Sequence, residues 1–202
     1  HTANLELMRN GRGLQIKGSG ESSGFPITVN FTNFSIATIA AMIKSDTLFA
    51  DGLINGTVKL DAVAPVKFVA DLTIDSIQAM SQPIGTLALK ASSPSPDVFN
   101  VNAELKGDSV DVVVKGDYKT TGDDNLDFDI NIPEFSLAAA QPFVRDIVSD
   151  LKGMANGRLT LGGSTSKPVV RGSLSMKNAS LIYSAYGTGL RIPDETIVFD
   201  DQ

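Results

Sequence analysis

The stretch Phe34-Ser35-Ile36-Ala37 recurs 101 residues further along the chain (from 34 to 135) as Phe135-Ser136-Leu137-Ala138. The pair Asn55-Gly56 recurs at the same offset as Asn156-Gly157, and the surrounding apolar and polar positions keep the same phase. A repeat at fixed spacing predicts an architecture that extends by adding similar units, each packed against its neighbours. Function then belongs to the surface that the units share.

The repeat divides the chain into three predicted parts. Residues 1–30 are expected to be strands of a preceding unit, residues 31–131 the first unit, and residues 132–202 a truncated second unit. An alternating pattern is still running at the last residues, so we expect the sequence to be a piece of a longer protein.

Apolar and polar residues alternate at every second position over most of the chain. Turn-forming groups such as Asn10-Gly11, Lys106-Gly107-Asp108 and Gly162-Gly163-Ser164 interrupt the alternation. This pattern is typical of antiparallel strands with one apolar and one solvated face, and it predicts more than about 40% strand. We therefore predict a mainly β fold built from an antiparallel repeat sheet.

Two segments break the alternation, and both belong to the repeat. Apolar residues at helical spacing follow Ser35 and Ser136, whose hydroxyls are suited to capping a helix N-terminus. The pattern predicts short amphipathic helices over residues 36–45 and 137–152, with Pro142 disturbing the start of the second. Two roles stay open here: a helix that touches lipid or acts as a gate, and a helix that plugs the open end of a sheet.

The composition leaves little material for catalysis. The 202 residues include no cysteine, so thiolate metal ligands and disulfides are excluded. They include a single histidine, His1, which leaves little basis for histidine-based catalysis. The net charge of −6 argues against nucleic acid, which needs clustered lysine and arginine. Asp127 and Asp129 alternate with apolar residues along a strand, which favours a solvated face over a glycosidase or calcium site. We expect no enzymatic activity, no cofactor and no metal.

The second unit has a regular spacing of glycine, leucine and proline. It runs through Gly157-Arg158-Leu159-Thr160-Leu161-Gly162-Gly163, Lys167-Pro168-Val169-Val170-Arg171-Gly172-Ser173-Leu174 and Lys177-Asn178-Ala179-Ser180-Leu181. This spacing is similar to the signature of TamB proteins, the inner-membrane subunit of the translocation and assembly module. The resemblance covers residues 135–199 and is weaker in the first unit, where Asp61 stands in the place of Gly162. The wider group of AsmA-like proteins shares much of this sequence pattern.

The resemblance implies an envelope protein of a diderm bacterium, anchored in the inner membrane and crossing the periplasm as a long, groove-shaped sheet. Members of the family are associated with phospholipid transport to the outer membrane and with a partner barrel of the Omp85 type. It therefore implies a β-taco-like fold, a periplasmic location, and phospholipid acyl chains and such a barrel as partners.

Two functions from different classes remain compatible with the residues. In the first, the sheet forms an elongated open groove of a lipid conduit, where each buried methylene contributes roughly 0.8 kcal/mol. In the second, the chain is a structural, adhesive or sugar-binding β-repeat with a closed core. The absence of tryptophan and the presence of only three tyrosines favour the first over an aromatic sugar platform. The predicted groove lining is Phe68, Leu72, Phe99, Val101, Leu105, Val112, Phe128, Ile130, Leu159, Leu161, Leu174 and Met176.

Overall fold

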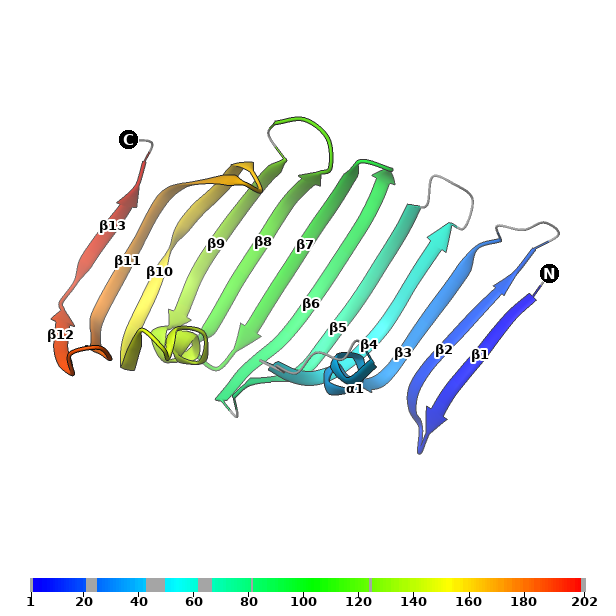
Figure 1. Ribbon diagram of the computed structural model, residues 1–202, viewed down its shortest axis with the longest axis horizontal. Helices are drawn as coiled ribbons and strands as arrows, with labels where there is room; N and C mark the ends of the chain where they lie inside the picture. Colours follow the sequence, from blue (N-terminus) through cyan, green and yellow to red (C-terminus); the bar gives the residue numbers. More distant parts are fainter. Residues whose placement is uncertain are drawn as a thin grey trace.

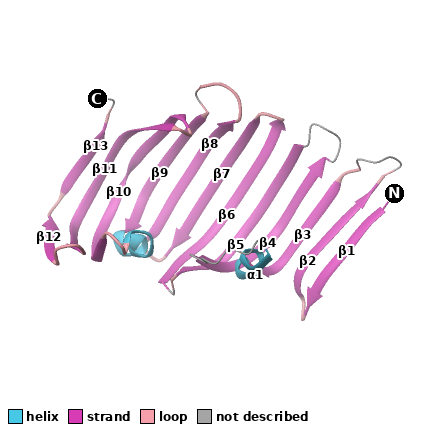
Figure 2. Cartoon of the chain, in the orientation of Figure 1, coloured by secondary structure: helices cyan, strands magenta, loops and turns pink. Residues whose placement is uncertain are grey.

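The computed structural model describes residues 2–20, 25–42, 50–61, 67–80, 82–123 and 125–200. These residues form one antiparallel sheet of 13 strands that does not close into a barrel, together with two short helical segments (Figures 1 and 2). Strands make up 78% of the structure, which confirms the predicted mainly β class and antiparallel sheet.

The strands follow the order of the sequence. Their bounds are β1 (Thr2–Arg9), β2 (Arg12–Ser19), β3 (Ile27–Ser35), β4 (Ala50–Asp61), β5 (Lys67–Ala79), β6 (Gln82–Ser95), β7 (Val98–Gly107), β8 (Val110–Lys119), β9 (Leu126–Ser136), β10 (Val148–Ser164), β11 (Lys167–Tyr183), β12 (Thr188–Ile192) and β13 (Glu195–Phe199). Neighbours in the chain are neighbours in the sheet from β1 to β12, and β13 pairs with β11. Short connections between neighbouring antiparallel strands require no crossover, as the alternating pattern predicts.

The first predicted helix is present. Helix α1 spans Ile36–Met42, and the backbone N–H of Ala37 donates to Ser35 Oγ at 3.1 Å, as expected for a serine cap. The predicted continuation over residues 43–45 lies outside the described residues.

The second predicted helix is present, but it is shorter than the predicted range of residues 137–152. A 3-10 turn, η1 (Leu137–Ala140), and one α-helical turn, α2 (Gln141–Val144), occupy the first half of that range, and β10 begins at Val148. The apolar spacing that suggested one helix therefore belongs to different elements.

Local hydrogen bonding explains why this helix ends early. Pro142 has no N–H with which to continue a helix that began at Leu137, and Ser136 makes no capping bond. The side-chain amide of Gln141 donates to the carbonyl of Val148 and accepts the N–H of Leu151, both at 2.8 Å. These two bonds favour the strand conformation at the start of β10.

The repeat is visible in the order of elements. At the 101-residue offset, β3, α1, β4 and β5 correspond to β9, the η1–α2 segment, β10 and β11. The predicted unit boundaries at residues 31 and 132 fall within β3 and β9, and they stay a prediction.

The helices mark one rim of the sheet, which we call the helix rim (Figure 1). Segment η1 packs against β10, β9 and β6, and α1 packs against β4 and β3. Most of the buried apolar side chains among the described residues lie near this rim: Phe34, Ile54, Ala79, Ile84, Val110, Ala155 and Ala179. The helices therefore complete a small core at one end of the strands, in agreement with a plugging role.

Bulges gather near the same rim. Near this rim the register shifts in the pairs β3–β4, β4–β5, β5–β6, β8–β9, β9–β10 and β10–β11, whereas the shift in β6–β7, between Ser92 and Ser95, lies at the opposite rim. Non-glycine residues with positive φ accompany them, including Asn33 at 44°, Ser76 at 54° and Asp150 at 52°. A bulge bends its strand and increases the local twist, so the strands change direction near the helix rim.

Asn55 links two of the bulged strands. Its Oδ1 accepts the backbone N–H of Asn33 at 2.8 Å, and its Nδ2 donates to Asp75 Oδ2 at 3.0 Å, beside Ser76. Positive φ is uncommon for non-glycine residues, so Asn33 and Ser76 need such support. A single side chain in β4 thus fixes the bends of β3 and β5 together.

We predict that Asn55→Ala lowers the free energy of unfolding by about 1–2 kcal/mol, because it removes the partners of a backbone N–H and of a carboxylate. The matched control is Asn102→Ala in β7, an exposed residue that makes no side-chain hydrogen bond within the described part of the chain. Urea unfolding measures both variants. Equal losses of stability in the two would contradict the role assigned to Asn55.

Candidate functional site

Apolar side chains form continuous rows across one face of the sheet. Residues that pair directly across antiparallel strands point to the same face, so the register defines each row. One row crosses β1 to β11 and ends on β13: Leu7, Leu14, Phe31, Gly56, Leu72, Leu89, Ala103, Val114, Ile130, Leu159, Gly172 and Phe199. We call this side of the sheet the apolar face.

The structure places all twelve predicted lining residues on the apolar face. Leu72, Ile130 and Leu159 belong to the row above. The neighbouring row contains Val101, Phe128 and Leu161, where Val101 and Phe128 pair with Gly116 on either side. The others lie one or two rows away: Leu105, Val112, Leu174 and Met176 towards the helix rim, and Phe68 and Phe99 towards the opposite rim.

Each of these twelve side chains is half-buried. They shield one another along the rows, and the described strands pack mainly against their neighbours within the sheet. Among the described residues, no large side chain is completely buried. The apolar face away from the helix rim is therefore partly open.

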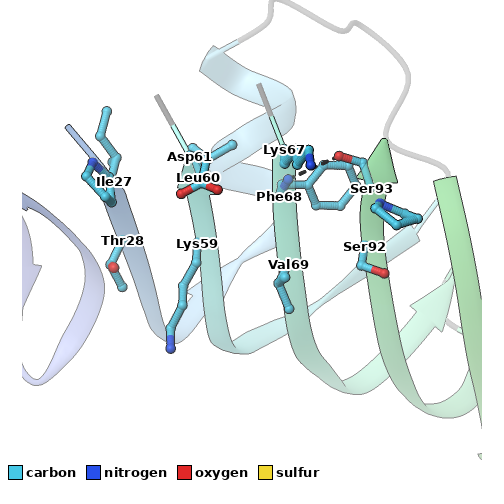
Figure 3. A pocket seen from close by; sticks show the side chains of 12 residues that line it. Ile27, Thr28, Lys59, Leu60, Asp61, Lys67, Phe68, Val69, Ser92 and Ser93 are labelled. Atoms are coloured by element: carbon cyan, nitrogen blue, oxygen red, sulfur yellow. Dashed lines mark hydrogen bonds between the residues drawn. The ribbon is translucent and has the colours of Figure 1, made fainter. Parts of the chain in front are cut away.

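Aromatic rings gather towards the rim opposite the helices, which we call the far rim. The ring centroids of Phe68 and Phe99 lie 5.9 Å apart, and those of Phe99 and Tyr118 6.0 Å apart, within the range of favourable aromatic pairs. Ser93, only 3% exposed, accepts the backbone N–H of Phe68 at 3.2 Å (Figure 3). The predicted lining omitted Tyr118, although it continues the alternation of Val114 and Gly116.

Two glycines interrupt the rows where strands approach closely. A Cβ on Gly56, whose φ is +121°, would lie 2.2 Å from the carbonyl oxygen of Asp71. A Cβ on Gly116, whose φ is +157°, would lie 2.0 Å from the carbonyl oxygen of Asp127. Glycine is required at both positions, and it leaves Leu72 and Phe128 facing a residue without a side chain.

The opposite face is polar. One of its rows reads Glu6, Gln15, Asn30, Thr57, Asp71, Lys90, Asn102, Lys115, Asp129, Thr160 and Arg171. Thr57 Oγ1 donates to Asn30 Oδ1 at 2.9 Å, and Lys90 lies 3.5 Å from Asp71. Asp127 and Asp129 are exposed on this face, so their interpretation as solvated residues is confirmed.

One ion pair on the polar face shifts the pKa of both partners. Lys106 donates a hydrogen bond to Glu104 at 2.7 Å, which lowers the pKa of Glu104 below its usual value and raises that of Lys106. The attraction weakens as the pH falls through the lowered pKa of Glu104. Both side chains are exposed, so solvent screening keeps the effect on stability small.

Comparisons with protein-family models, with curated proteins and with solved structures find no match for this chain. Within the described residues, no helix has the length and apolar character needed to cross a membrane. The same residues contain no group of three or more histidine, cysteine, aspartate or glutamate side chains arranged to hold a metal ion. The apolar face is thus the feature of the fold that invites a functional explanation.

We predict that truncation costs less on the apolar face than at the helix rim. Leu159→Ala removes a half-buried side chain and should lower the free energy of unfolding by about 1–2 kcal/mol. Ile54→Ala removes a side chain that is 6% exposed and should cost about 3 kcal/mol. Urea unfolding of the two single variants gives the difference. A cost for Leu159→Ala as large as that for Ile54→Ala would show that the face is closed.

Proposed function

We propose that this chain is a lipid-binding segment of a periplasmic lipid conduit, in which phospholipid acyl chains lie against the apolar face. The observation that supports this most strongly is the row of half-buried apolar side chains that runs across an unclosed sheet. Soluble proteins rarely leave a large contiguous apolar surface uncovered, and those that do use it for binding. Acyl chains match this surface, because it needs apolar area and no specific polar partner.

A bent sheet suits this role better than a flat one. The bulges near the helix rim bend the strands, and Figure 3 shows strands curving along their length. In the proposed trough the apolar face is the inner side of the bend. The two arms of each strand then shield an acyl chain from water, and the short helices cover one end of the strands.

The rows also suit movement of a lipid across the strands. Neighbouring strands lie roughly 4.8 Å apart, so a chain that slides along a row meets an equivalent apolar position at each strand. Each methylene contributes roughly 0.8 kcal/mol when it is buried, which makes the total binding strong while single steps stay small. The long row described above contains no charged or polar side chain that would oppose such a step.

The resemblance to TamB proteins extends the proposal to the whole protein. It adds anchoring in the inner membrane of a diderm bacterium, transfer of phospholipid between the inner and outer membranes, and support of outer-membrane biogenesis. It also adds an Omp85-type barrel as the outer-membrane partner. The alternative, a structural, adhesive or sugar-binding repeat, differs in that the same face is covered by protein.

We predict that a charge on the apolar face blocks lipid binding without unfolding the protein. Phe128 and Leu161 pair directly across β9 and β10, so Phe128→Asp and Leu161→Asp each place a carboxylate in the middle of the face. An acyl chain beside that carboxylate removes part of its water, and binding of a fluorescent phospholipid should weaken at least about tenfold. Melting temperature and lipid titration are measured for each variant.

The matched control is Asn102→Asp, which adds the same charge on the polar face between Lys90 and Lys115. It should bind lipid like the unchanged protein. Outright unfolding of both apolar-face variants would favour the closed core of the alternative. Unchanged lipid binding in two folded variants would remove the apolar face from the binding site.

A further inference from the structure

A tight turn brings two arginines together at the helix rim. Asn10 and Gly11 connect β1 to β2, and their φ angles of 53° and 73° are both positive, as one class of two-residue hairpin turn requires. The turn holds Arg9 directly opposite Arg12. The short sequence Arg-Asn-Gly-Arg thus fixes a pair of guanidinium groups side by side.

The two arginines share a face with the apolar rows. In β1, Arg9 comes two residues after Leu7. In β2, Arg12 comes two residues before Leu14, and the register between the two strands has no shift. Side chains two residues apart in a strand point to the same face, so both arginines belong to the apolar face. Roughly 7 Å of strand separates them from the paired leucines that begin the long row.

A hollow of about 860 Å³ lies beside the arginines, where β3 leads into α1. Both arginines line it, together with Leu7, Phe34 and Thr38. Helix α1 packs mainly against β4 and β3, and Leu7 is 47% exposed, so this end of β1 and β2 is open. Figure 1 shows the β1–β2 turn at the same rim as α1. The hollow falls within the roughly 300–1,000 Å³ of pockets for small ligands.

The charge of the hollow differs in sign from that of the chain. The full sequence has a net charge of −6, yet the described residues that line the hollow include Arg9, Arg12 and no aspartate or glutamate. Neither arginine forms an ion pair with another described residue. Asp51, at the same rim, already accepts Ser35 Oγ at 3.3 Å and the N–H of Gly52 at 2.7 Å. Like charges directly opposite each other destabilise a strand pair, and an anion between the two arginines would relieve this repulsion.

We propose that this hollow binds the phosphate of an anionic phospholipid head group. A guanidinium donates two parallel hydrogen bonds to a phosphate, so Arg9 and Arg12 together can hold it from two sides. The acyl chain then passes Leu7 and Leu14 and follows the long row towards Phe31. This inference rests on the proposed function, since the acyl chain needs the apolar face. It adds an orientation, with the head group at the helix rim, and a preference for negative charge.

The test compares two phospholipids with the same fluorescent acyl chain, phosphatidylglycerol, which is anionic, and phosphatidylcholine, which is zwitterionic. The unchanged protein should bind phosphatidylglycerol about tenfold more tightly at low salt, because basic side chains attract an anionic head group and salt screens this attraction. The double variant Arg9→Gln, Arg12→Gln should bind both lipids with similar affinity. Both side chains are exposed, so the double variant should melt at or above the temperature of the unchanged protein.

The matched control is Lys59→Gln with Lys67→Gln, which removes the same charge from the polar face at the far rim. Figure 3 shows the Lys59 side chain pointing away from Leu60, which lies on the apolar face. The control should therefore keep the preference for phosphatidylglycerol. Loss of the preference in this control would assign it to net charge and would overturn the inference.

The other outcomes separate the inference from the proposed function. Equal affinity of the unchanged protein for both lipids, or a preference that survives in Arg9→Gln, Arg12→Gln, would overturn the inference and leave lipid binding by the face intact. Binding of neither lipid would overturn the proposed function itself. Displacement of phosphatidylglycerol by millimolar inorganic phosphate at constant ionic strength would identify a site for free anions and would also overturn the inference.

Discussion

The register of the backbone hydrogen bonds is the constraint on which the rest of the structure depends. Because side chains alternate between faces, a shift of one residue in any strand would move its apolar side chains to the polar side. The bulges preserve the faces while they bend the strands. Phe135 and Ile132 are three residues apart in β9, yet they pair with Ala155 and Gly157, which are two apart in β10. The extra residue is absorbed between them, and the apolar face continues on both sides.

The residues that stabilise the sheet and the open part of the apolar face lie in different parts of the structure. The helix rim contains most of the buried apolar side chains, and η1 and α1 complete it. The polar face adds hydrogen bonds between strands, such as those of Asn55 and Thr57. With these contributions in place, the middle of the apolar face need not be closed by a second layer. A half-open face of this kind is what binding of an acyl chain requires, since the chain must displace water rather than protein.

The sequence predicts the face better than the ends of the elements. Alternation is a local property of each strand, so the phase of residues such as Leu72, Phe128 and Leu161 follows from their spacing alone. The early end of the second helix depends on the side chain of Gln141, which binds the start of β10 and leaves no periodic signal. The aromatic contacts at the far rim were not predicted either. The rings of Phe68, Phe99 and Tyr118 meet only because β5 to β8 pair in one particular register.

Mass spectrometry of lipid extracted from the purified protein tests the central claim most directly. The protein is prepared without detergent from a bacterial envelope fraction, and Phe128→Asp is prepared in parallel as a folded variant with an obstructed face. The account predicts phospholipid in near-stoichiometric amount with the unchanged protein and much less with the variant. A folded, unchanged protein that contains no phospholipid, or the same amount in both preparations, would contradict it.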